Sequence, residues 1–251
     1  MQNLFDLSGK VAIITGASTG LGAGMTLGLA GAGADIVLVD HRKREGVVKA
    51  VQEMGRRALA INGDLTDSEF IKDVVRKASD KFGQVDILVN NAGTIRRNPA
   101  VNFSEQDWDD VLNLNAKSVF LLSQAVARQM IPRKYGKIIN IASLLSFSGG
   151  ITVPSYAASK GAVAQLTKAL ANEWAQHGVC VNAIAPGYMV TENSRALREN
   201  PQRNEAILSR IPTGRWGEST DMQGAAIFLA SSASDYVNGH VLTVDGGRMA
   251  R

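Results

Sequence analysis

Short apolar runs rich in valine and isoleucine recur along the chain, and stretches with helical spacing of apolar residues separate them. Runs that are apolar on both faces are typical of buried parallel strands. Regular alternation of strand and helix predicts an α/β fold with an open, doubly wound parallel sheet and helices on both faces. The seven expected strands lie at residues 11–14, 36–39, 58–61, 85–89, 138–141, 179–184 and 241–244.

The alternation continues through all 251 residues without a linker, a low-complexity tract or an internal repeat. The longest stretches between expected strands, 68–82 and 104–131, predict helices. Folds of the α/β class commonly use about 250 residues as one unit. We therefore expect residues 1–251 to form a single domain. Ligands of such sheets bind beyond the carboxyl ends of the strands, so the loops that follow strands are where a site is expected.

Composition excludes several classes of partner. The net charge of +4 is a small excess of 27 basic over 23 acidic side chains. The sequence lacks a basic stripe with interleaved aromatic residues, so nucleic-acid binding is not expected. No apolar run approaches the roughly 20 residues of a membrane helix. The three histidines and Cys180 are scattered, so no metal site is expected. The single cysteine and the acidic residue Asp6 near the start predict a cytoplasmic protein without a secretory leader.

A glycine-rich loop at residues 15–22 follows the first expected strand and leads into an apolar helix. Glycine permits a tight turn and close approach of backbone to a pyrophosphate, and the helix N-terminus supplies unpaired N–H groups. The glycine spacing is longer than G-x-G-x-x-G, but the strand, loop and helix occur in the order that a Rossmann-type dinucleotide site requires. The expected cofactor contacts in this loop are Gly16, Ser18, Thr19, Gly20, Leu21 and Gly22.

The second expected strand ends at Asp40, 20 residues beyond Gly20. A carboxylate at about this spacing hydrogen-bonds the adenine-ribose hydroxyls of NAD, and it would repel the 2′-phosphate of NADP. Asp40 therefore favours NAD over NADP. Arg42 and Lys43 follow closely and offer positive charge for a phosphate, so the sequence leaves use of NADP open.

A candidate catalytic group follows the fifth expected strand. Ser143 lies near the end of that strand, and a helix that opens around Pro154 carries Tyr156 and, one turn later, Lys160. Residues at i and i+4 share a helix face, so the lysine ammonium is expected near the phenol, where it would lower the tyrosine pKa from about 10. Tyr156 would then exchange a proton with a substrate hydroxyl or carbonyl, and Ser143 would hold that oxygen by a hydrogen bond.

Taken together, these motifs resemble the short-chain dehydrogenase/reductase family along nearly the whole chain. The stretches that carry the resemblance are Thr15-Gly16-x-x-x-Gly20-x-Gly22, Asn90-Asn91-Ala92-Gly93, Leu114-Asn115-Ala116, the trio Ser143, Tyr156 and Lys160, and Pro186-Gly187 followed by Thr191. The resemblance implies an NAD(P)-dependent oxidoreductase. A non-catalytic NAD(P)-binding regulatory protein is the alternative, and the presence of both Tyr156 and Lys160 disfavours it.

The resemblance also implies roles for individual residues. Asn115 would act in catalysis by holding a water that links Lys160 to solvent, and Lys160 would bind the nicotinamide ribose. Further cofactor contacts would come from Asp64, Leu65, Asn91, Ala92, Gly93, Tyr156, Pro186, Gly187, Met189 and Thr191. Homotetramers of the family pair the helix around Asn115 and the helix after Tyr156 across subunits, so a homotetramer is expected.

Residues 93–97, 107–111, 143–147 with 149–150, and 210–217 resemble one subfamily, which acts with NAD on the sugar acid 2-dehydro-3-deoxy-D-gluconate at C5 in pectin and uronate catabolism. A sugar acid needs a cation for its carboxylate, and a guanidinium can bind it bidentately. The expected substrate contacts are Arg96, Ser143 and Tyr156, with Arg97, Arg210 and Arg215 as alternative cations. Gluconate and 3-oxoacyl thioesters are the alternative substrates. A basic segment between Tyr188 and Ile211 favours a sugar acid over an acyl chain.

Overall fold

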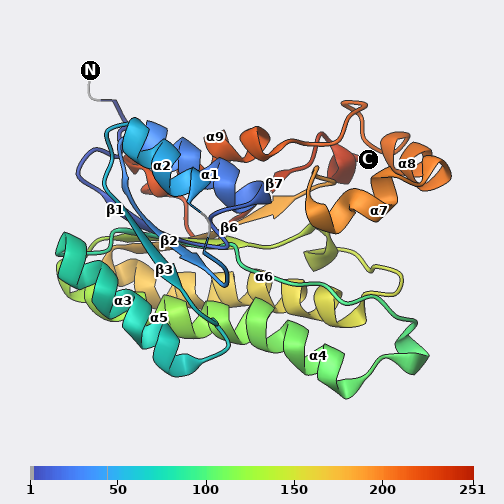
Figure 1. Cartoon of the computed structure of the whole chain (residues 1–251), viewed down its shortest axis with the longest axis horizontal. Helices are drawn as coiled ribbons and strands as arrows, with labels where there is room; N and C mark the ends of the chain where they lie inside the picture. The colour runs from blue at the N-terminus through green and yellow to red at the C-terminus, as the bar shows by residue number, and fades with distance from the viewer. Residues whose placement is uncertain (1–2, 44) are drawn as a thin grey trace.

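The computed structural model describes residues 3–43 and 45–251, and residues 1, 2 and 44 of the expected domain lie outside that description. The described residues form one seven-stranded sheet in which every neighbouring pair is parallel (Figure 1). The strands are β1 (Val11–Thr15), β2 (Asp35–Asp40), β3 (Ala58–Asn62), β4 (Ile87–Asn90), β5 (Gly136–Ile141), β6 (Val179–Pro186) and β7 (Val241–Val244). Their order is β3-β2-β1-β4-β5-β6-β7, so the predicted fold class is confirmed.

Helices cover both faces of this sheet (Figure 1). One face carries α1 (Gly20–Gly31), α2 (Gly46–Glu53) and α9 (Gln223–Ala230), and the other carries α3 (Ser68–Phe82), α4 (Glu105–Leu112), α5 (Ser118–Arg133) and α6 (Pro154–Trp174). The short helices α7 (Arg195–Arg198) and α8 (Pro201–Leu208) project beyond one end of the sheet. Among the helices of residues 3–43 and 45–251, none is long and apolar enough to cross a membrane.

Alternate residues of the central strands enter two separate cores. Val11 and Ile13 of β1 pack with α3, α5 and α6, whereas Ala12 and Ile14 pack with α1 and α9. Burial on both faces explains why the strand sequences are continuously apolar. The expectation of burial is wrong for the edge strands: Ala60 of β3 is exposed, and the residues of β7 are only half-buried or exposed. An edge strand has a neighbour on one side only, and helices cover it less completely.

A buried amide network joins the central strands to two helices. Nδ2 of Asn90 on β4 donates to Oδ1 of Asn140 on β5 at 2.8 Å and to Oγ of Ser123 on α5 at 2.9 Å. Nδ2 of Asn140 then donates to Oγ1 of Thr167 on α6 at 3.0 Å. Since buried polar groups are costly unless they are paired, these bonds set the position of α5 and α6 under the strands.

The expected helix at 104–131 runs from Glu105 to Arg133, but it is not α-helical throughout. A π-helical turn, Asn113–Lys117, separates α4 from α5 and places Asn115 in the interior. A π turn adds one residue to the helical repeat without changing the amphipathic composition around it, so apolar spacing did not reveal it. Such turns occur frequently at functional sites, and this one lies at the end of the sheet where the strands' carboxyl ends converge.

Candidate active site

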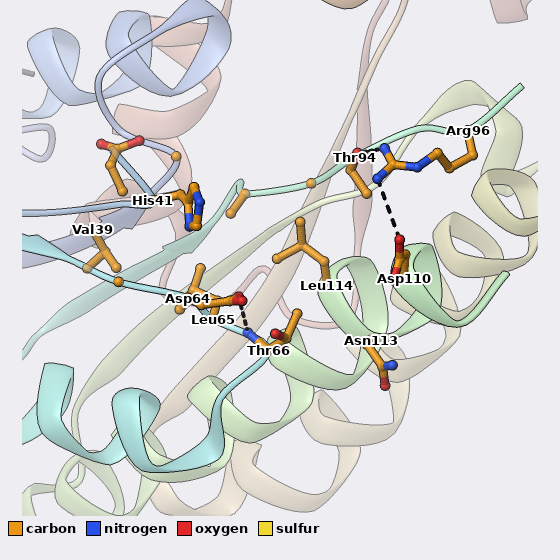
Figure 2. A pocket seen from close by; sticks show the side chains of 15 residues that line it. Val39, His41, Asp64, Leu65, Thr66, Thr94, Arg96, Asp110, Asn113 and Leu114 are labelled. Atoms are coloured by element: carbon orange, nitrogen blue, oxygen red, sulfur yellow. Dashed lines mark hydrogen bonds and ion pairs between the residues drawn. The ribbon is translucent and has the colours of Figure 1, made fainter. Parts of the chain in front are cut away.

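A cleft of about 460 Å³ lies at the carboxyl ends of β1 to β4, where the strand order reverses (Figure 2). The loops after these strands form its walls, as expected for an open parallel sheet. Its lining includes Gly16, Asp40, Asp64, Leu65, Ala92 and Gly93 from the expected cofactor contacts, together with His41, Thr66, Thr94, Arg96 and Leu114. The topology thus brings together side chains that are up to about 100 residues apart in the sequence.

The loops after β1 and β4 are joined by hydrogen bonds centred on Thr15. Oγ1 of Thr15 accepts from the main-chain N–H groups of Asn91 and Ala92, each at 2.9 Å. In return, Nδ2 of Asn91 donates to the carbonyl oxygens of Thr15 at 2.9 Å and Gly16 at 3.1 Å. The side-chain amide of Asn91, an expected cofactor contact, therefore holds the glycine loop in place.

Glycine is required in this loop first of all by the protein's own backbone. A Cβ on Gly22 would lie 1.9 Å from the carbonyl oxygen of Gly16, and Gly16 has a φ of +62°, which disfavours other residues. In the described structure, Thr19 at the start of α1 makes no side-chain capping bond, and the first turn holds no acidic residue. The N–H groups there suit a pyrophosphate, so the loop fits a dinucleotide. Leu21 packs against the apolar core instead of facing the cleft.

The segment after β6, residues 187–191, contacts the glycine loop at residues 15–22. A Cβ on Gly20 would lie 3.7 Å from the methyl group of Thr191, so Thr191 sits over the start of α1. Met189 is buried and forms a parallel bridge with Gly217, which holds this segment down. Pro186 ends β6, and a Cβ on Gly187 would lie 2.7 Å from Cα of Asp245. Of the expected nicotinamide-side residues, Thr191 therefore contacts the glycine loop, whereas Met189 and Gly187 pack against Gly217 and Asp245. None of them is among the residues that line the cleft.

Acidic groups mark the end of the cleft expected to hold adenosine. Oγ of Ser18 donates to the Asp40 carboxylate at 2.5 Å, which links the glycine loop to the end of β2. The carboxylate of Asp64 accepts from the main-chain N–H of Thr66 at 2.8 Å, and this bond lowers the Asp64 pKa (Figure 2). His41 lines the same end of the cleft. Carboxylates here suit the hydroxyls of a ribose.

Asn115 anchors the opposite end of the cleft. Its Oδ1 accepts from the main-chain N–H of Thr94 at 2.8 Å, and its Nδ2 donates to the Thr94 carbonyl at 2.9 Å and to Oγ of Ser159 at 3.1 Å. A Cβ on Gly93 would lie only 3.1 Å from the same Oδ1. The side chain of Asn115 thus ties the loop after β4 to α6 at Ser159, the residue directly before Lys160.

The expected catalytic trio is brought together at the ends of β5 and α6. Ser143 precedes a 3₁₀ turn (Leu144–Ser146), and its hydroxyl forms a hydrogen bond with Tyr156. Nζ of the buried Lys160 lies 5.7 Å from the centre of the Tyr156 ring and donates to the carbonyl of Ile141 at 2.6 Å. The serine, the phenol and the ammonium therefore lie close together, where the end of β5 meets the start of α6.

The pKa values differ from the expectation. Burial raises the pKa of Tyr156 above its usual value, and the hydrogen bond from Ser143 and the positive charge of Arg97 act in the opposite direction. Burial also lowers the pKa of Lys160 to about 8. The expectation that Lys160 lowers the pKa of Tyr156 is wrong for this structure, because desolvation of the phenol dominates and the ammonium is bonded to a carbonyl.

The expected arginines have different environments. The guanidinium of Arg96 pairs with the carboxylate of Asp107 at 3.2 Å. It also pairs with the carboxylate of Asp110 at 3.6 Å (Figure 2). Arg215 likewise pairs with a carboxylate of the chain, that of Asp221. An arginine that already faces two carboxylates is a poor ligand for a third. The structure therefore disfavours Arg96 as the group that binds a substrate carboxylate.

Sequence reasoning did not assign two residues that support the site. The loop motif contains Thr15 without giving it a role, although its hydroxyl joins the loops after β1 and β4. Ser159 receives the Asn115 bond and donates to the carbonyl of Tyr156 at 2.8 Å. A hydroxyl at a buried strand end is an available signal for Thr15. Nothing in the sequence distinguishes Ser159 from other helix serines.

Comparison with known proteins identifies the family. The model of the family described as short chain dehydrogenase matches residues 10–202. The chain belongs to the short-chain dehydrogenase family. Members of this family bind NAD(P), and the expectation of a dehydrogenase or reductase acting on alcohols and ketones is confirmed. The functional assignment of the individual residues stays a prediction.

Close relatives cover the whole chain. A 2-dehydro-3-deoxy-D-gluconate 5-dehydrogenase of Dickeya dadantii is 59% identical over 250 residues, 99% of each chain. A protein of the same name from Escherichia coli is 56% identical over 248 residues, 98% of each chain. A crystal structure described as a 2-deoxy-D-gluconate 3-dehydrogenase of Agrobacterium tumefaciens, with NADP bound, has a TM-score of 0.94 and 51% identity, with full coverage of both chains.

Thr15→Val tests the junction of the two loops. Valine has the shape of threonine but no hydroxyl, so two main-chain N–H groups would lose their acceptor. We expect a loss of about 2 kcal/mol in the free energy of unfolding, because unpaired buried donors are costly, and weaker NADH binding. Urea unfolding and NADH fluorescence measure both quantities. Thr15→Ser keeps the hydroxyl, so its stability and NADH binding should match those of wild type. If the two variants gave the same stability and the same NADH binding, the role of the Thr15 hydroxyl in joining the loops would be contradicted.

The lowered pKa of Lys160 predicts a pH dependence of stability. Between about pH 8 and 10.5 the unfolded chain binds a proton at Lys160 that the folded chain has lost, so this residue increases stability as pH rises through that window. Across the whole window, the free energy of unfolding should rise by about 3 kcal/mol. Lys160→Met should remove this increase, whereas Lys168→Met, at an exposed position of the same helix, should keep it. Urea unfolding without cofactor from pH 7 to 10 measures the free energy of unfolding of wild type and both variants. If that free energy changes with pH in the same way in Lys160→Met as in wild type, the prediction is contradicted.

Proposed function

We propose that this chain is an oxidoreductase of a sugar acid, interconverting the 5-hydroxyl and the 5-ketone of 2-dehydro-3-deoxy-D-gluconate. The observation that carries the proposal is the group formed by Ser143, Tyr156 and Lys160 beside a cleft that fits a dinucleotide. The names of the relatives at 56% and 59% identity support the substrate. In this role a bound nicotinamide takes up or supplies the hydride.

Tyr156 exchanges the proton in the proposed mechanism. Its raised pKa keeps the phenol protonated at neutral pH, so it is suited to give a proton to a ketone oxygen during reduction. In the oxidation direction the phenol must first lose that proton, which favours higher pH. Ser143 donates a hydrogen bond to the same substrate oxygen and stabilises the negative charge that develops there.

Lys160 and Asn115 support this proton transfer. With a pKa of about 8, Lys160 changes its charge close to neutral pH, so its ammonium can pass a proton onward at little cost. Every polar atom of the Asn115 side chain is engaged by Thr94 and Ser159, so the side chain holds the loop and α6 together. A relay water would therefore bind to its main chain.

Arg97 is the proposed ligand of the substrate carboxylate. Its side chain is exposed, and its positive charge reaches Tyr156 strongly enough to act on the tyrosine pKa. One of its nitrogens lies 3.4 Å from the carbonyl of Asn193, in the segment after β6. Among the salt bridges of the described residues, none involves Arg97, in contrast to Arg96. A carboxylate held here would direct the carbon chain of the acid toward Tyr156.

NAD is the proposed preferred cofactor. The Asp40 carboxylate lies at the end of β2, bonded to Ser18 of the glycine loop, and it would repel a 2′-phosphate. Residues that offer positive charge to such a phosphate, Arg42 and Lys43, are exposed next to it. The structure of the Agrobacterium tumefaciens relative contains NADP, and a comparison of turnover with NAD(H) and NADP(H) tests the preference of this chain.

The activity test follows NADH absorbance with 2-dehydro-3-deoxy-D-gluconate, gluconate and an acetoacetyl thioester, each with NAD(H) and NADP(H). We expect fastest turnover of 2-dehydro-3-deoxy-D-gluconate with NAD. Tyr156→Phe should lower kcat by about 100-fold or more, since general acid–base catalysis contributes that much, and should still bind NADH. Turnover of the thioester alone would contradict the sugar-acid proposal, and near-normal kcat in Tyr156→Phe would contradict the role of the phenol.

Arg97→Gln tests the carboxylate ligand. Loss of a charge-assisted hydrogen bond costs about 1.5–3 kcal/mol, so the KM for the sugar acid should rise by about 10- to 100-fold. Arg96→Gln is the matched control, and its KM should stay within about threefold of wild type. A substrate analogue with an amide in place of the carboxylate should show no difference between the variants. A larger effect of Arg96→Gln would reverse the assignment.

A further inference from the structure

The turn after β5 holds hydroxyl groups besides that of Ser143. Oγ of Ser146 donates to the main-chain carbonyl of Lys160 at 2.6 Å, although the two residues are 14 positions apart. The side chain is half-buried between the turn and α6. This bond therefore joins the turn that carries Ser143 to the helix turn that carries Tyr156 and Lys160.

The same hydroxyl also contacts the backbone of the catalytic serine. The main-chain N–H of Ser143 donates to Oγ of Ser146 at 3.3 Å, and the main-chain N–H of Leu145 donates to Oγ of Ser143 at 3.1 Å. A hydroxyl has one proton to donate and lone pairs to accept, so Ser146 can make both of its bonds at once. Ser146 thus links the peptide unit of Ser143 directly to that of Lys160.

This link matters because it joins the Ser143 turn itself to α6, whose first turn lacks a side-chain cap. In the described structure, Val153 at the start of α6 makes no side-chain capping bond, and Thr152 before it has a φ of +64°. That backbone region is costly for a β-branched residue. Ser143 and Tyr156 must meet at one substrate oxygen, and a misplacement of about 1 Å can cost about 100-fold in rate. A contact between the two backbones is a direct way to keep their spacing.

We propose that Ser146 is a positioning residue, which holds the Ser143 hydroxyl at the correct distance and direction from Tyr156 through its bonds to the main chains of Ser143 and Lys160. The inference rests on the proposed roles of Ser143 and Tyr156. It does not depend on the identity of the substrate.

Ser146→Ala tests this role, and Ser148→Ala is the matched control. Oγ of Ser148 donates to the Leu144 carbonyl at 3.2 Å, within the turn, so that hydroxyl bonds to no part of α6. We expect kcat to fall about 10- to 100-fold in Ser146→Ala, with the Kd for NADH within about twofold of wild type. Ser148→Ala should keep its kcat within about threefold of wild type. Ser146→Thr retains a hydroxyl and should recover part of the rate.

The pH profile separates positioning from a general loss of structure. The hydrogen bond from Ser143 lowers the pKa of Tyr156, so a misplaced Ser143 should move the acid limb of kcat/KM for oxidation to higher pH. A purely structural role would change stability and leave that limb in place. If Ser146→Ala does not fold, Ser146→Cys, with its weak thiol donor, replaces it in the same comparison.

Three results would overturn the inference: an unchanged kcat in Ser146→Ala, an equal loss in Ser148→Ala, or a lower kcat with an unmoved acid limb. The measurement uses whichever ketone or alcohol the wild-type enzyme turns over. Failure of wild type on sugar acids, with turnover of another ketone, would contradict the proposed function and still allow the Ser146 comparison to be made.

Discussion

The site depends on the hydrogen bonds that join the loops after β1 and β4. At this point the connections leave the sheet toward opposite faces, so the two neighbouring loops would separate without a link. Thr15 and Asn91 supply that link through four bonds between side chains and main chain. The close contact of Gly22 with the Gly16 carbonyl then sets the start of α1 against the same junction. This packing sets the shape of the cleft at the switch point between β1 and β4.

The helix α6 connects that cleft to the chemistry. On its buried face, the hydroxyl of Thr167 accepts a hydrogen bond from the Asn140 amide, and the hydroxyl of Ser159 accepts one from the Asn115 amide. Amide groups from β5 and from the π turn therefore hold the helix at two positions along its length. The lysine on this face bonds to the end of β5 at Ile141. Tyr156 is therefore positioned by a set of polar contacts that reach from the sheet centre to the cleft. The burial of Tyr156 and Lys160 explains both the raised pKa of the phenol and the lowered pKa of the lysine.

Prediction from the sequence succeeded where a residue's neighbours along the chain decide its secondary structure. Each run of valine and isoleucine forms a strand, and the helix at 68–82 has the expected ends. The sequence carries no such signal where distant contacts decide a residue's environment. Arg96 is paired with Asp107 and Asp110 because α4 packs beside its loop, and no spacing in the sequence shows that ion pair.

The sequence by itself determined the fold class, the family and the types of side chain available for chemistry, because apolar periodicity and short motifs are local properties. Only the tertiary structure decided which side chains face one another. It assigned the Asn91 amide to the glycine loop, left Arg97 rather than Arg96 near the phenol, and connected Ser146 to Lys160. Such contacts arise from the crossing of helices and strands in space, and burial there sets charge and hydrogen bonding.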